Sequence, residues 1–242
     1  MIVINQKRIK IILSCILISL FVFTAKTYNK QNKNDGGENI QTTATPASGK
    51  TIIIDAGHGT PDEGAQSSSG TTEAQTNLKI ALKLQNLLEQ NGSKVILTRS
   101  DNNAIYDLDS KTLKQKKISD IHNRVKIGNE NSADIFVSIH LNKIPQSEYH
   151  GWQCFYNTKN EKSIELAKKI QENLNEAIQK ENTRVAMKLN TVYIMKNIEI
   201  PISIVECGFL SNPEEEKKLL EDSYQDRLAW GIYNGILDYF YN

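Results

Sequence analysis

From residue 50 onward, short apolar runs alternate with longer segments of helical periodicity, and this alternation restricts the chain to few folds. The runs are rich in β-branched and aromatic residues, which favours strands, and they cover residues 51–55, 94–98, 134–140, 151–156 and 202–206. Several are apolar throughout, so both faces of their sheet should be covered. The alternation predicts a single α/β domain with a largely parallel sheet and helices on both faces.

Helices are predicted where apolar residues recur every three or four positions, in residues 73–90, 117–131 and 163–180. Asn212 and Pro213 precede three glutamates and predict a helix start, because Asn caps a helix, Pro fits its first turn and acidic side chains favour its amino end. Ser223 and Asp226 resemble a capping pair for the last helix. The less regular segments are predicted to be loops over the sheet edge: residues 101–116 and 182–200.

The first 28 residues have the pattern of a signal peptide or membrane anchor. Residues 11–25 are apolar and uncharged, and basic side chains precede them. As a helix this run would be about 22 Å long, short of the roughly 30 Å hydrocarbon core, which suits a signal peptide. Phe23 is bulky for a cleavage site, so an uncleaved anchor also fits. In both cases we expect membrane contact through residues 11–25, and export of the rest of the chain to the outer side of the cytoplasmic membrane.

Composition separates a linker from the domain and excludes two classes of protein. Residues 29–49 are polar and contain Gly, Pro, Ser and Thr, which predicts a flexible linker before a folded domain at 50–242. Residues 1–30 hold five basic side chains and no acidic one, whereas the rest of the chain holds 24 basic and 28 acidic side chains. That balance argues against nucleic-acid binding. The three cysteines form no CxxC pair, which excludes a disulfide framework and a thiolate zinc site.

Four side chains that can bind a metal or carry a proton lie near predicted strand ends. His58 follows the first strand, Glu73 opens the next helix, and two later strands end at His140 and Glu206. In open α/β sheets the ligand crevice lies at the carboxyl ends of the strands. The predicted topology therefore brings these residues to one edge of the sheet.

Two imidazoles and a carboxylate form a ligand set that catalytic zinc uses, with a fourth position left for water or substrate. On this hypothesis His58, Glu73 and His140 bind Zn²⁺, and Glu206 stands off the metal. The apolar neighbours of Glu206 would raise its pKa toward neutrality, which suits a general acid or base.

Each of these residues also has a purely structural interpretation. A histidine at a strand end is more often a packing residue than a metal ligand. Glu73 could only complement a helix dipole, and Glu206 could be a buried carboxylate paired with an arginine. Cys207 is more typical of a small buried hydrophobe than of a nucleophile. His122 fits a packing position, and His150 fits a solvated loop.

At these residues the sequence resembles the zinc-dependent N-acetylmuramoyl-L-alanine amidases of the type 3 family. The matching segments are IIIDAGHGTPDEGA (52–65), Glu73, ILTRSDN (96–102), residues 124–142 and VECGFLSNPEEEKKLL (205–220). Within that family, the germination-specific spore-cortex amidases are the closest in appearance, through SIHLNKIP (138–145), GWQCFY (151–156) and GILDYF (235–240).

The resemblance implies a mixed, twisted sheet flanked by helices, with His58, Glu73 and His140 as ligands of one Zn²⁺ and Glu206 as the catalytic carboxylate. It implies hydrolysis of the amide that joins the lactyl group of N-acetylmuramic acid to L-alanine in peptidoglycan. The closer subgroup implies action in the spore cortex or the forespore intermembrane space, leading toward muramic lactam, and allows a stabilising or targeting protein partner. The alternatives are a zinc peptidase of peptide stems and a non-catalytic cell-wall-binding module.

Overall fold

The computed structural model describes residues 44–178 and 182–241. The predicted leader at 1–28 and most of the predicted linker lie outside the described residues. The strands are β1 (Thr51–Ala56), β2 (Lys94–Leu97), β3 (Ile135–Asn142), β4 (Gln153–Tyr156), β5 (Met187–Lys188) and β6 (Ile202–Phe209). The helices are α2 (Glu73–Gln90), α3 (Leu113–Glu130), α4 (Glu161–Ile178), α5 (Tyr193–Asn197), α6 (Pro213–Leu219) and α7 (Asp222–Tyr241).

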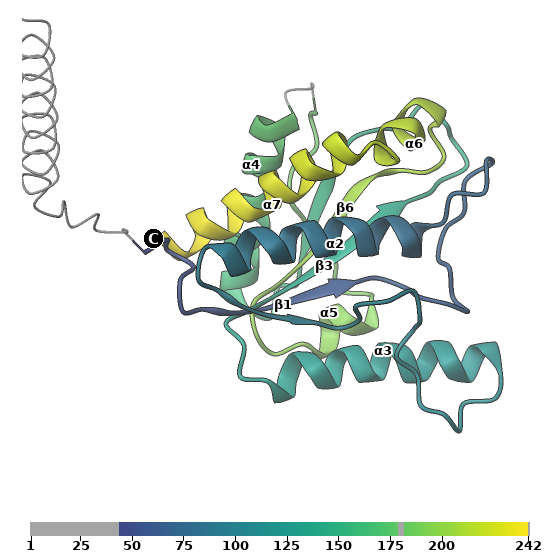
Figure 1. The fold of residues 1–242 in the computed structure, drawn as a ribbon, viewed down its shortest axis with the longest axis horizontal. Coiled ribbons are helices and arrows are strands. Elements are labelled where there is room, and N and C mark those ends of the chain that lie inside the picture. The colour runs from purple at the N-terminus through teal and green to yellow at the C-terminus, as the bar shows by residue number, and fades with distance from the viewer. Residues whose placement is uncertain (1–43, 179–181, 242) are drawn as a thin grey trace, which may run out of the picture. The chain divides into compact units, whose positions relative to one another are not determined.

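The six strands form one sheet in the order β2-β1-β3-β6-β4-β5. All neighbouring strands are parallel except β4 and β6, which are antiparallel. Helices α2, α4 and α7 cover one face of the sheet, and α3 and α5 cover the other (Figure 1). The predicted α/β class, with a mixed and mostly parallel sheet between two helical layers, is confirmed.

The apolar run of β1 shows why the sequence dictates this arrangement. Successive side chains of a strand point to opposite faces. Ile52 and Ile54 therefore join the core under α2, α4 and α7, whereas Ile53 joins the core under α3 and α5. All three side chains are fully buried. A strand with helices on both sides cannot alternate between apolar and polar residues, which accounts for its continuous apolar sequence.

Several boundaries differ from the sequence predictions. Ala47 is fully buried, and the main-chain amide of Gly49 donates to the carbonyl of Gly92 at 2.9 Å, so residues 44–49 belong to the packed domain and not to the linker. The segment 182–200 is not only a loop, because it contains β5 and α5. These two elements are two and five residues long, too short for a hydrophobic period to reveal them.

Helix ends differ in the same way. Helix α3 starts at Leu113 rather than at 117, after a capping box formed by Thr112 and Gln115. Helix α7 starts at Asp222, so Ser223 lies inside its first turn and is not its cap. The predicted cap of α6 is confirmed, since Asn212 Oδ1 accepts from two main-chain amides of that helix, each at 3.0 Å. None of the helices in the described ranges is both long and apolar enough to cross a membrane.

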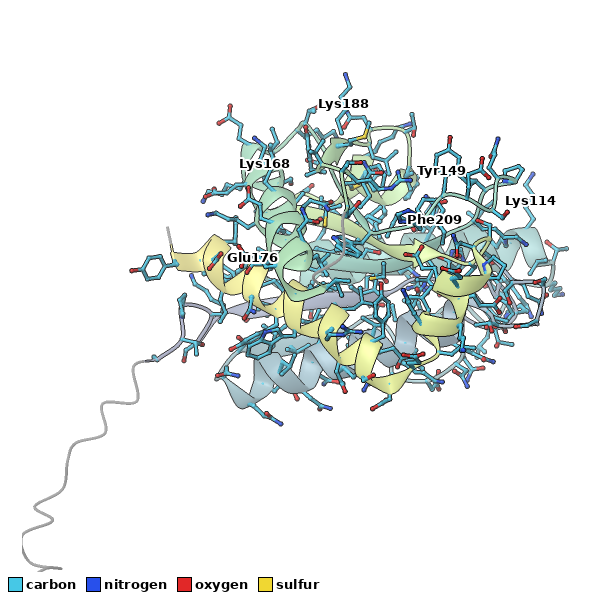
Figure 2. All side chains as sticks on the ribbon, turned by 90° about the horizontal axis from the view of Figure 1, so that it is seen from above. Lys114, Tyr149, Lys168, Glu176, Lys188 and Phe209 are labelled. Atoms are coloured by element: carbon cyan, nitrogen blue, oxygen red, sulfur yellow. The ribbon has the colours of Figure 1, made fainter. Side chains whose placement is uncertain are left out.

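Loops at the carboxyl ends of the strands are tied to one another. Lys143, after β3, donates to the carbonyl of Gln66 at 2.5 Å. Tyr149 lies beside Phe209 at the end of β6, with ring centroids 6.4 Å apart (Figure 2). Arg184 stacks over the Phe209 ring at 4.8 Å. Segments far apart in the sequence are thus joined around this edge of the sheet.

Candidate metal centre

The predicted site residues come from three neighbouring strands and one helix. His58 is the second residue after β1, and His140 and Glu206 are register partners on β3 and β6. Glu73 is the first residue of α2, where the chain returns to the sheet. The structure therefore brings His58, Glu73 and His140 together, with their nearest ligand atoms all within 4.8 Å of one another.

The distances within this group fit one divalent metal ion. His58 Nε2 lies 3.3 Å from Glu73 Oε2, and His140 Nδ1 lies 2.9 Å from Glu73 Oε1. Ligands bonded at 2.0–2.1 Å around a tetrahedral ion are about 3.3 Å apart, so small shifts would place all three atoms on one ion. The two imidazole rings meet edge to face, with centroids 5.1 Å apart.

Glu73 is buried and held as a carboxylate. Its Oε2 accepts from the main-chain amide of Ala65 at 2.8 Å, and its Oε1 accepts from that of Leu141 at 3.1 Å. Burial would raise the pKa of this carboxyl, but hydrogen bonds and charge from His140 and His58 hold the pKa far below its usual range. The side chain is therefore ionised over the whole neutral range, as a metal ligand must be.

Two glycines let the backbone approach the group. A Cβ on Gly57 would lie 2.3 Å from the ring of His140, and a Cβ on Gly64 would lie 2.6 Å from Glu73 Oε2. Gly64 also has a positive φ of 68°, a conformation that few other residues adopt. The close contact between loop and ligands thus depends on the absence of side chains at these two positions.

His58 itself sits in a left-handed conformation, with φ of 64°, in the loop after β1. Such a backbone persists in a bulky residue only where its surroundings impose it. Arg124 Nη2 donates to the His58 carbonyl at 2.6 Å, and Arg99 Nη2 donates to the Gly57 carbonyl at 3.0 Å. Two buried guanidinium groups therefore fix the main chain of the loop after β1 through its carbonyls.

This arginine network has no counterpart among the sequence predictions. Arg124 also bonds Asp120 at 2.8 Å and forms an ion pair with Asp55, which in turn accepts from Ser138 at 2.6 Å. The sequence does contain a pattern that indicates a buried ion pair. Asp55 ends a continuous apolar run, and Arg124 lies between Ile121 and Gly128 on the packing face of its helix. Charged residues at such positions need a buried partner.

Glu206 lies beside the histidines in a drier environment. Its Oε2 is buried, and the described residues offer that atom no hydrogen bond. Burial raises the pKa of this carboxyl to about 7. The charge of His140 lowers the pKa by less than burial raises it, and the negative charge of Glu73 raises it further. The alternative of a Glu206–arginine pair is thus absent from the described part of the chain. A carboxyl with a pKa near 7 can both take and give a proton at neutral pH.

A cavity of about 300 Å³ opens next to these groups. Its lining includes His58, His140 and Glu206. The apolar part of its wall consists of Ile121, Leu189, Val192, Ile194 and Ile204. A substrate group bound there would lie next to both the candidate metal position and the carboxyl of Glu206.

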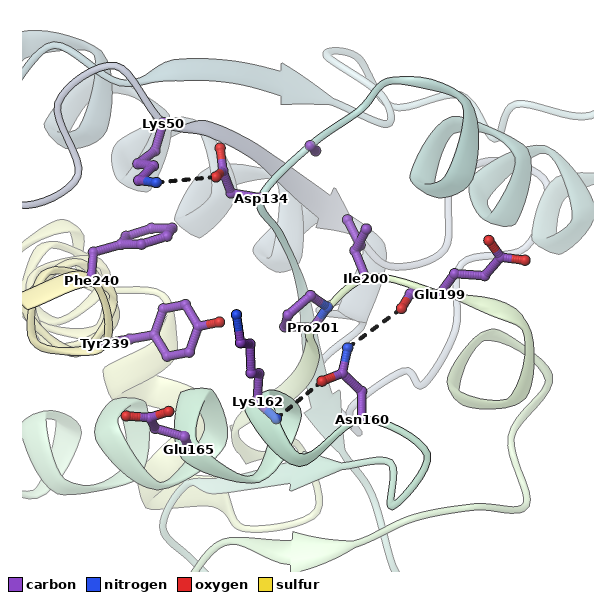
Figure 3. A pocket seen from close by; sticks show the side chains of 11 residues that line it. Lys50, Asp134, Asn160, Lys162, Glu165, Glu199, Ile200, Pro201, Tyr239 and Phe240 are labelled. Atoms are coloured by element: carbon purple, nitrogen blue, oxygen red, sulfur yellow. Dashed lines mark hydrogen bonds and ion pairs between the residues drawn. The ribbon is translucent and has the colours of Figure 1, made fainter. Parts of the chain in front are cut away.

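A larger cavity, of about 660 Å³, lies at the opposite ends of the strands (Figure 3). It is lined by residues that precede β1, β3 and β6, among them Lys50 and Asp134, which form a 3.3 Å ion pair. Within the described ranges, the only group of three side chains suited to a metal is the one at the carboxyl ends. The cavity with the greater volume is therefore not the one beside the candidate metal site.

The other candidates have structural positions. Cys207 is fully buried, and burial raises the pKa of its thiol well above the usual value, which removes it as a nucleophile. His122 packs against the ring of Tyr193 with centroids 4.8 Å apart, and His150 is exposed in a loop. Neither belongs to the metal-binding group.

Known proteins resemble this chain over most of its length. The family model for N-acetylmuramoyl-L-alanine amidase matches residues 52–238. The germination-specific N-acetylmuramoyl-L-alanine amidase of Bacillus subtilis is 38% identical over 195 residues, which cover 81% of each chain. The Clostridioides difficile CwlD amidase, solved in complex with the GerS lipoprotein, is 45% identical with a TM-score of 0.76, over 78% of this chain and 98% of that one.

A further solved structure, the N-acetylmuramoyl-L-alanine amidase of Clostridium difficile 630, is 32% identical with a TM-score of 0.69 over 79% of this chain and 97% of that one. The matched region contains every residue of the candidate site. The chain therefore belongs to the N-acetylmuramoyl-L-alanine amidase family and is an enzyme of that activity.

Proposed function

We propose that this enzyme hydrolyses, with zinc, the amide between the lactyl group of N-acetylmuramic acid and L-alanine in spore-cortex peptidoglycan. The product is a glycan strand whose muramic acid is free of peptide and can go on toward muramic lactam. The observation that carries the proposal is the convergence of His58, Glu73 and His140 within 4.8 Å, beside the unpaired oxygen of Glu206. The cortex is proposed because the B. subtilis relative is named as germination-specific.

Zinc is the proposed metal because the donor set is two imidazole nitrogens and one carboxylate, which leaves a fourth tetrahedral position open. When bound, zinc would polarise the scissile carbonyl and lower the pKa of a water molecule toward about 7. His58, Glu73 and His140 would hold the ion, and the ionised state of Glu73 would offset part of its charge.

Glu206 is proposed as the general base and acid. Its carboxylate takes a proton from the attacking water, and the resulting carboxylic acid then delivers that proton to the amine of L-alanine as the C–N bond breaks. A pKa near 7 suits both steps, since the group changes state readily at neutral pH. The unpaired Oε2 is free to make the hydrogen bonds that these transfers require.

Peptidoglycan lies outside the cytoplasmic membrane, so we propose that the enzyme acts there, exported or anchored through residues 1–28. We also propose a protein partner that stabilises or targets the domain. The support is that the C. difficile CwlD amidase was solved together with a lipoprotein.

The test is a product analysis with the purified chain and defined cortex muropeptides. Mass spectrometry should detect a free lactyl carboxyl on the sugar and a free L-alanine amino terminus, and a chelator should abolish both until Zn²⁺ is restored. Cleavage within the stem peptide would instead identify a zinc peptidase. Binding to peptidoglycan with no turnover, with and without Zn²⁺, would identify a wall-binding module.

A further inference from the structure

The loop that carries His58 also supplies a carboxylate to the ring nitrogen that faces away from Glu73. His58 Nε2 is the nitrogen near Glu73, at 3.3 Å. Its Nδ1 lies 3.3 Å from Asp62 Oδ2, four residues further along the loop. An imidazole can bind a metal through one nitrogen only if the proton sits on the other, and an acceptor at that second nitrogen favours this tautomer.

Asp62 is itself fixed from several directions. Its main-chain amide donates to the Gly59 carbonyl at 2.8 Å, and the amide of Gly59 donates back at 2.9 Å, which closes the loop. Its Oδ1 pairs with Lys117 on α3 at 2.9 Å and accepts from the Gly64 amide at 3.4 Å. These contacts leave Oδ2 directed at the His58 ring.

The second histidine is held differently. His140 lies in β3, and its Nδ1 is the nitrogen near Glu73. Among the described residues, no side chain or carbonyl bonds its Nε2, and the ring instead packs directly on Gly57. The strand orients His140, whereas His58 lies in a loop and needs a side chain to orient its ring.

We propose that Asp62 is a positioning residue for the metal: it accepts the Nδ1 proton of His58, which keeps the Nε2 lone pair directed at the ion, and Lys117 keeps Asp62 in place. The inference rests on the proposed metal function. Contacts of this kind between a carboxylate and a ligand histidine strengthen metal binding by about 10- to 100-fold.

The test compares zinc affinities of the full chain, measured by competition with a chromophoric chelator. Asp62→Ala should weaken zinc binding about 10- to 100-fold. Glu63→Ala is the matched control, because it removes the neighbouring carboxylate, which accepts from Thr60 and touches no ligand. The control should bind zinc as the unaltered chain does. Equal affinity in Asp62→Ala and the control would overturn the proposal.

A spectroscopic readout separates orientation from a general loss of structure. In the zinc-loaded chain with ¹⁵N-labelled histidine, the His58 signals should show a protonated Nδ1, and Lys117→Met should broaden or shift that signal while Asp62 is still present. If Asp62→Ala fails to fold, Asp62→Leu decides, because Leu has a similar size and no oxygen that could accept from His58 Nδ1. A reduced zinc affinity with a shifted Nδ1 signal supports the proposal, and unchanged values for both overturn it. Absence of zinc binding by the unaltered chain would instead defeat the proposed function.

Discussion

The two histidines of the site lie near the carboxyl ends of neighbouring strands, yet different parts of the structure hold them. His140 is inside β3, where its register with Glu206 follows from main-chain pairing of two buried strands. His58 is in a loop with a strained backbone, and its carbonyl is held by Arg124, 66 residues away in the sequence. The strand-borne pair therefore needs the sheet, while the loop-borne ligand needs a specific set of distant side chains.

Of the two strand residues only His140 belongs to the metal-binding group, so a change at Glu206 is predicted to remove chemistry but leave the metal in place. Glu206→Gln keeps the shape of the side chain and removes its ability to take a proton, so turnover of muropeptides should fall about 100- to 10,000-fold. Metal analysis should show zinc at the level of the unaltered chain, because Glu206 is not one of the grouped ligands.

The matched control for this change is Glu214→Gln, an exposed glutamate on α6, which should keep full activity. Turnover by Glu206→Gln within tenfold of the unaltered chain would contradict the role of Glu206. Loss of zinc together with activity would show instead that Glu206, and not only His140 on the neighbouring strand, is part of the metal-binding structure.

On the loop side, the comparison predicts damage to stability as well as to the site. Arg124→Met leaves Asp55 and Asp120 without their buried cation, and removal of one partner from a buried ion pair costs about 3–5 kcal/mol. Urea unfolding of the metal-free chain should show this loss. Lys126→Met, an exposed basic residue on the same helix, should change stability by less than about 0.5 kcal/mol. Equal effects of the two changes would remove Arg124 as the support of the loop.

The contrast between strand residues and loop residues also explains which features could be predicted from the sequence. The buried strands, the helix over 73–90 and the meeting of His140 with Glu206 at one edge of the sheet follow from local patterns. The strand ends do not, because β3 continues to Asn142 and β6 to Phe209, beyond the predicted ends at His140 and Glu206. The arginine network could not be predicted in this way. The pairing of Arg124 with Asp55 depends on how a helix packs across a sheet, and no local period records that packing.

The pH dependence of stability tests the environment of Glu206. Its pKa is about 7 in the folded chain and about 4.3 when unfolded, so between these values the folded state binds more protons than the unfolded state. Glu206 therefore reduces stability progressively as pH rises from about 4.3 to about 7, by on the order of 4 kcal/mol in total.

In Glu206→Gln the side chain is neutral at every pH, so the variant lacks this pH-dependent loss of stability. Denaturant unfolding of both metal-free chains should show equal stability near pH 4, and a growing advantage for the variant toward pH 8. A difference between the two chains that does not change with pH would mean that Glu206 is not desolvated. Titrating groups that do not interact with Glu206 are common to both chains and cancel in the comparison, whereas His140, Glu73 and His58 are coupled to it.

The smallest expected effect concerns the glycines of the loop. Gly64 and Gly49 both have positive φ, of 68° and 77°, but a Cβ would lie 2.6 Å from Glu73 Oε2 at Gly64 and would meet nothing within 4 Å at Gly49. Gly49→Ala should lose only the backbone term, about 1–2 kcal/mol. Gly64→Ala should lose about 1 kcal/mol more through overpacking, and should also weaken zinc binding because Glu73 must move. Equal stability and equal zinc affinity in the two variants would mean that the loop can move away from Glu73. In that case the left-handed backbone requires glycine at position 64, and close packing against the metal-binding residues does not.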